Sequence, residues 1–124
     1  MPGLAAQWRT AAAVACALGI SACSHIHLVG ADRTLQVALT EYRLRPQDVR
    51  VSSGPLTIFV HNYGRLTHSL AVSINHSTAG STGPVLPGQS AVLSLYLSPG
   101  HYLMASTILS DQALGQYGTL TVTR

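Results

Sequence analysis

The chain of 124 residues contains no lysine and little charge of either sign. Its seven basic residues are all arginine, its acidic residues number four, and charged residues make up 9% of the sequence. The arginines are scattered, so no basic run exists that could follow a phosphate backbone, and we expect no nucleic-acid partner. A hydrophobic content of 47% argues against a disordered polar chain, and the length suits one domain.

Cysteine is absent from everything after position 23. The chain has two cysteines, Cys16 and Cys23. The rest of the sequence therefore has no means to form an internal disulfide, a thiolate metal site or a cysteine nucleophile. Tryptophan is also missing after Trp8, and the whole chain has a single phenylalanine. Aliphatic side chains must therefore supply most of the core.

Residues 1–22 have the organisation of a secretory signal peptide. One basic residue, Arg9, precedes an uncharged apolar stretch at 11–20, and small residues follow that stretch. The apolar stretch is too short to span a bilayer, which requires about 20 residues. The sequence Ile20-Ser21-Ala22-Cys23 also resembles the lipobox of bacterial lipoproteins, in which the cysteine becomes the acylated first residue of the mature protein.

The lipobox resemblance implies a palmitate-type anchor on Cys23. We therefore expect residues 1–22 to be removed, residues 23–33 to form a lipidated N-terminus and tether, and residues 34–124 to form the folded domain. A cysteine with more than one acyl chain holds a protein stably at a membrane, and the expected location is the extracytoplasmic face of the cell membrane. Two alternatives stay open: a cleaved signal peptide with an incidental cysteine, and an ordinary buried first helix.

After the leader, the sequence has the pattern of short strands separated by turns. Alternation of apolar and polar residues predicts strands at 35–40, 49–51, 56–61, 69–74, 91–97, 102–108 and 118–123. Pro87-Gly88 and Pro99-Gly100 predict turns, and the small residues at 77–83 predict a loop. Apolar residues do not recur at helical spacing, so we predict an all-β fold, an antiparallel sandwich or barrel of about seven strands.

Several short motifs resemble, in order and spacing, those of the cupredoxins, the family of plastocyanin and azurin. They are similar to that family's third strand and first ligand loop, to the two turns before its last strands, and to its closing strand. In this chain they are Phe59-Val-His-Asn62-x-Gly64, Leu86-Pro-Gly88-x-Ser90, Leu97-Ser-Pro-Gly100-x-Tyr102 and Gly115-Gln116-Tyr117-Gly118-Thr119-Leu120-Thr121-Val122. The resemblance implies a Greek-key β-sandwich of seven to eight strands.

The resemblance also places four polar residues where cupredoxins hold copper. His68 corresponds to the first histidine ligand, and Ser106-x4-Asp111-x4-Gln116 keeps the spacing of the family's cysteine, second histidine and methionine. Glutamine is tolerated as the weak axial ligand of a blue-copper site, but a serine hydroxyl is a poor substitute for the thiolate. The resemblance therefore implies a cupredoxin-like domain with degenerate ligands and without a type 1 copper centre.

Two functions are the main candidates for these residues. The first is a hydrogen-bonded polar cluster at one end of the sandwich, in a binding or structural module that is not an enzyme and needs no cofactor. The alternative is a non-blue copper or zinc site in which His68 and Asp111 are joined by another histidine, His61, His76 or His101.

Two further functions are also open. Ser106, His68 and Asp111 are the residue types of a nucleophilic triad, although no glycine-rich segment is placed to supply an oxyanion hole. An unknown protein or envelope ligand is a second possibility, bound through an exposed loop at Tyr63 and Arg65 or at 77–83. We favour the polar cluster in a binding or structural module over all of these.

Overall fold

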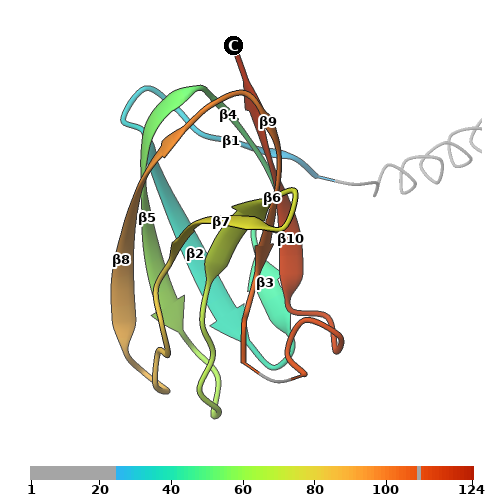
Figure 1. Ribbon diagram of the computed structural model, residues 1–124. Helices are drawn as coiled ribbons and strands as arrows, with labels where there is room; N and C mark the ends of the chain where they lie inside the picture. The colour runs from blue at the N-terminus through green and yellow to red at the C-terminus, as the bar shows by residue number, and fades with distance from the viewer. Residues whose placement is uncertain (1–24, 109) are drawn as a thin grey trace, which may run out of the picture.

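The computed structural model describes residues 25–108 and 110–124 (Figure 1). The predicted signal peptide at 1–22 and the predicted lipidation site, Cys23, lie outside these residues. Within the described ranges, no helix is both long enough and apolar enough to cross a bilayer.

The described residues form ten strands in two sheets. The four-stranded sheet has the order β3 (Arg43–Arg45), β2 (Thr34–Thr40), β5 (Gly54–Asn62) and β8 (Ser90–Leu97). The six-stranded sheet has the order β1 (His27–Leu28), β4 (Asp48–Ser52), β10 (Tyr117–Thr123), β9 (Gly100–Ala105), β6 (Ala71–Ile74) and β7 (Ser77–Ser81). The predicted all-β sandwich is confirmed.

The pairing of the strands is mixed, whereas the sequence pattern led us to predict an antiparallel arrangement. β2 pairs with β5 in parallel and β4 pairs with β10 in parallel, while β5–β8 and β9–β10 are antiparallel. The reason is the path of the chain, which crosses between the sheets from β3 to β4 and again from β4 to β5. Neighbours in one sheet are therefore often not consecutive in the sequence.

All seven predicted strands are present, together with three short strands that were not predicted, β1, β3 and β7. The loop predicted at 77–83 is wrong, because β7 occupies most of it and pairs with β6. β9 ends at Ala105, earlier than predicted, and β6 begins only at Ala71. At these two ends the amides of Ser69 and Ile108 donate to a side chain, Ser106 Oγ, instead of to a neighbouring strand.

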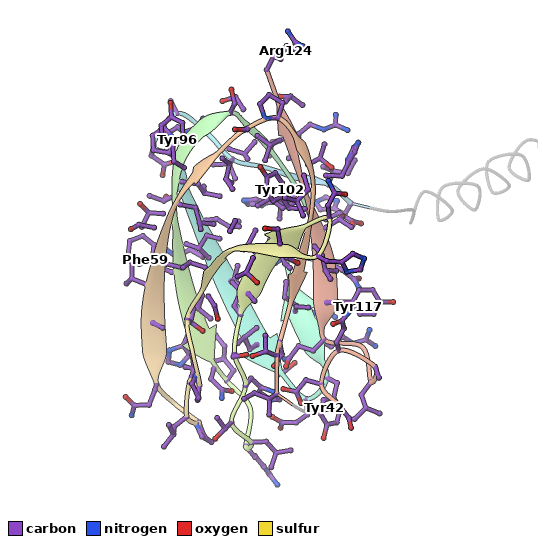
Figure 2. The ribbon with its side chains drawn as sticks, in the orientation of Figure 1. Tyr42, Phe59, Tyr96, Tyr102, Tyr117 and Arg124 are labelled. Carbon is purple, nitrogen blue, oxygen red and sulfur yellow. The ribbon has the colours of Figure 1, made fainter. Side chains whose placement is uncertain are left out.

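The core between the sheets is largely aliphatic, as the composition predicts. The inward-facing residues of β2, from Leu35 to Leu39, and of β5, from Leu56 to Val60, are at most 2% exposed and alternate with outward-facing residues. Phe59 lies on the outer face of β5 with 39% of its surface exposed, whereas Tyr102 is buried in the core (Figure 2).

Four connections meet at the end of the sandwich opposite the C-terminus (Figure 1). They are the β2–β3 turn at 41–42 and the loops at 63–70, 82–89 and 106–116. The Pro87-Gly88 turn predicted from the sequence is one of their features, and Gly88 has a φ of 80°, a conformation that glycine adopts without strain. This loop end carries the polar residues His68, Ser106, Asp111 and Gln116.

Candidate functional site

The loop between β5 and β6 places His68 at the loop end. Asn62, the last residue of β5, is fully buried, and its Nδ2 donates to the carbonyl oxygens of Leu66 (2.7 Å) and Val85 (2.8 Å). Its Oδ1 accepts from the amide of Gly64 at 2.8 Å. His68 then pairs with Val85 through two backbone hydrogen bonds of 3.1 and 2.7 Å. These bonds fix the backbone of His68 independently of its side chain.

Both ring nitrogens of His68 contact carboxylates. Nε2 lies 2.6 Å from Oε2 of Glu41, and Nδ1 lies 2.8 Å from Oδ2 of Asp111. The residue is completely buried, and the ring of Tyr42 meets the imidazole edge-on, with 6.1 Å between ring centroids. An ionised carboxylate only accepts hydrogen bonds, so both ring nitrogens must donate. The arrangement is that of an imidazolium held between two carboxylates.

The electrostatics favour the charged forms of His68 and Glu41. Burial lowers the pKa of His68, but hydrogen bonds to Asp111 and Glu41 and the attraction of both carboxylates outweigh burial, so its pKa is raised. The pKa of Glu41 is lowered, first by a hydrogen bond from the amide of Arg65 and then by His68.

Glu41 was not among the predicted site residues. It lies in the turn after β2, and its carboxylate accepts hydrogen bonds from the amides of Arg65 (2.9 and 3.0 Å) and Leu66 (3.2 Å). A Cβ added to Gly64 would overlap the Glu41 carboxylate, so this close approach requires glycine. The available signal was a rare acidic residue directly after an alternating strand, and nothing in the sequence pattern links it to His68.

The predicted residues Ser106 and Asp111 belong to the same network. Ser106 Oγ donates to Oδ2 of Asp111 at 2.7 Å and accepts from the amides of Ser69 and Ile108, both at 3.2 Å. Ser106 and Asp111 are 4% and 6% exposed. Asp111 therefore lies between Ser106 and His68. In a nucleophilic triad the imidazole lies in the middle and takes the hydroxyl proton, which is a different order.

Gln116 hydrogen-bonds the backbone beside this network. Its Nε2 donates to the carbonyl oxygens of Thr40 (2.6 Å) and Arg43 (2.9 Å), which ties the segment before β10 to the turn that carries Glu41. Its Oε1 is buried and has no hydrogen-bond partner within 25–108 and 110–124. The structure thus joins three of the four predicted residues in one network and places the fourth in a supporting position.

The three histidines considered as additional metal ligands point elsewhere. His61 lies on the outer side of β5, with Nδ1 2.6 Å from Ser90 Oγ and its ring 4.3 Å from that of Tyr63. His76 and His101 are exposed. Across the part of the chain that the structure describes, no group of three or more His, Cys, Asp or Glu side chains is arranged to hold a metal ion.

The chain resembles solved structures of known proteins in its fold, although no family model and no curated protein matches its sequence. The auracyanin of Roseiflexus castenholzii superposes with a TM-score of 0.68 at 18% identity, over 77% of this chain and 100% of that chain. Auracyanin A, a blue copper protein from Chloroflexus aurantiacus, gives 0.65 at 14% identity, over 77% and 99%. An azurin from Methylomonas sp. strain J gives 0.66 at 11% identity, over 76% and 100%. The two-sheet sandwich described above therefore has a cupredoxin-like fold.

Proposed function

We propose that this protein is a lipid-anchored, extracytoplasmic binding or structural module that keeps the cupredoxin-like sandwich and has an ionic hydrogen-bond network in place of a copper site. The observation that supports this most directly is the environment of His68, whose ring nitrogens lie 2.6 and 2.8 Å from two carboxylates. A histidine that binds a metal does so through the lone pair of a neutral imidazole. A metal at His68 would therefore have to displace Glu41 or Asp111 together with a proton.

The donor atoms at the remaining positions do not fit a type 1 copper centre. Such a centre needs a thiolate in its trigonal plane. Ser106, which the sequence pattern aligns with the cysteine, is a hydroxyl that donates to Asp111. Gln116, which aligns with the axial ligand, directs its amide nitrogen at two backbone carbonyls. No electron-transfer step follows from this set of residues.

We also propose that the network is not catalytic. The proton of Ser106 is directed at Asp111, so the imidazole of His68 is not placed to activate the hydroxyl as a general base. The Ser106 hydroxyl also accepts from the amides of Ser69 and Ile108, so both of its lone pairs are already engaged.

Titration with Cu(II) and with Zn(II) tests this proposal against the alternative, a non-blue metal site on His68 and Asp111. We expect calorimetry to detect no sub-micromolar binding of either metal by the purified protein, and visible spectroscopy to detect no intense blue absorption. The site variant is His68→Ala, and the matched control is His76→Ala, which removes an exposed histidine. Sub-micromolar binding that H68A loses and H76A retains would contradict the proposal and support the alternative.

The lipid anchor is tested separately, with the full chain expressed in a bacterial host. We expect labelled palmitate to be incorporated and the protein to fractionate with membranes, because two or more acyl chains on one cysteine give stable anchoring. Cys23→Ser is expected to abolish both results. Cys16→Ser, which changes the cysteine inside the predicted signal peptide, is the matched control and is expected to leave both intact. A C23S protein that keeps its label would show the anchor assignment to be wrong.

A further inference from the structure

A cavity of about 410 Å³ lies beside the network at the loop end. Its apolar walls come from three of the four connections that meet there, and Asp111 contributes to the lining with Tyr42, Leu66, Ile108 and Leu114. The volume falls within the range of about 300–1,000 Å³ that is typical of small-molecule sites. Figure 2 shows Tyr42 at this end of the sandwich.

One carboxylate oxygen of Asp111 makes no hydrogen bond within the network. Oδ2 accepts hydrogen bonds from both the His68 ring nitrogen Nδ1 and the Ser106 hydroxyl. Oδ1 has no hydrogen-bond partner among the residues described by the structure, and it is not one of the fully buried polar atoms. The side chain as a whole is 9% exposed. Asp111 lines the cavity and its Oδ2 already accepts two hydrogen bonds, so Oδ1 is the oxygen with free acceptor capacity for a ligand there.

The network of Glu41, His68 and Asp111 beside the cavity has a negative net charge in either protonation state of His68. Glu41 and Asp111 carry two negative charges, so an imidazolium leaves a net charge of −1 and a neutral imidazole leaves −2. Within the lining that the structure describes, no side chain is positively charged. The cavity therefore attracts a cation and disfavours an anion.

We propose that this cavity binds a small organic cation, an alkylammonium or arylammonium, with its ammonium group on Oδ1 of Asp111. The apolar part of the ligand would pack against Leu66, Ile108 and Leu114. A charge-assisted hydrogen bond in a partly desolvated site is stronger than a neutral one. This inference rests on the proposed function, because a metal ion held by Asp111 would use the same oxygen.

Three probes of similar size separate charge from apolar contact: benzylammonium, benzyl alcohol and benzoate. Binding to the purified protein is followed by amide chemical shifts in NMR spectra. We expect benzylammonium to bind with a Kd below about 1 mM and to shift the amides of Tyr42, Leu66 and Leu114. Benzyl alcohol is expected to bind roughly tenfold more weakly, and benzoate more weakly still. Equal binding of the ammonium and the alcohol would overturn the inference.

Arginine substitutions at two leucines of similar exposure test whether benzylammonium binds in the cavity. Leu114 lines the cavity and is 56% exposed, whereas Leu86 is 57% exposed, lies in another loop at this end and is not part of the lining. We expect Leu114→Arg to weaken benzylammonium binding about tenfold and Leu86→Arg to change it less than about twofold. Equal weakening in both variants would also overturn the inference.

The two proposals fail in different experiments. Tight metal binding that depends on His68 would contradict the proposed function, whatever the organic cation does. Absence of benzylammonium binding in a protein that also binds no metal would contradict only the ligand assignment.

Discussion

Asp111→Ala is expected to lower the free energy of unfolding by about 3–5 kcal/mol, the cost of removing one partner from a buried ion pair. The substitution leaves Nδ1 of the fully buried His68 without its acceptor and takes the acceptor from the Ser106 hydroxyl in the same step. Buried polar groups that lose their partners carry the full cost of desolvation. Chemical denaturation of the purified variant and of the unmodified protein measures the difference.

The matched control is Asp32→Ala, which removes an exposed carboxylate whose hydrogen bonds are local ones to Thr34. We expect a much smaller change there, because water replaces the lost contacts. Asp111→Asn, which keeps a hydrogen-bonding side chain but removes the charge, is expected to fall between the two. An Asp111→Ala protein as stable as the Asp32→Ala protein would show that the network contributes little to the fold.

The free energy of unfolding is expected to fall on both sides of a window that lies between pH 4.5 and pH 6.5. The ordinary pKa of His68 is 6.5, and it is raised in the folded protein, so its contribution is complete below 6.5 and is lost as pH rises through the raised pKa. The ordinary pKa of Glu41 is 4.5, and it is lowered, so its contribution is complete above 4.5 and is lost as pH falls through the lowered pKa.

Urea denaturation at a series of pH values measures this profile. The charged groups in contact with the imidazole are Glu41 and Asp111, and Tyr42 packs against its edge. Glu41→Gln is expected to make the loss of stability at low pH smaller, because the titrating carboxylate is gone. It is also expected to make the loss of stability at high pH smaller, because it removes one of the two carboxylates that raise the pKa of His68. His76→Ala, at an exposed site, should leave both limbs unchanged. A stability that does not change as pH rises past 6.5 would contradict the ionic description of the network.

The strands that could be predicted from the sequence are those with one buried and one exposed face. β2, β5 and β8 alternate in burial along their whole length, so their apolar residues recur at every second position. β7 was missed because its residues are mostly exposed on both faces and are small, so no alternation marks it. β3 was missed because it has only three residues and is followed directly by Pro46.

Only those site residues that occupy positions of the cupredoxin motifs could be predicted from the sequence. His68, Ser106 and Asp111 were identified because they occupy positions in a known order of motifs, and they do share one network. Glu41 lies 27 residues before His68 and outside those motifs, so only the fold brings the two together. The order of the contacts, with Asp111 in the centre, depends on side-chain direction in the 106–116 loop and has no counterpart in the linear pattern.

If Cys23 is lipidated as proposed, the pairing of β1 with β4 limits the distance between the domain and the bilayer. β1 begins at His27 and is held in the six-stranded sheet, only four residues after Cys23. Four residue steps of fully extended chain span at most about 14 Å. If Cys23 carries the lipid, the sandwich stays almost in contact with the headgroups and has no long flexible arm with which to sample the surrounding space. Its ligands and partners would then have to arrive at the membrane surface or reside in the same leaflet.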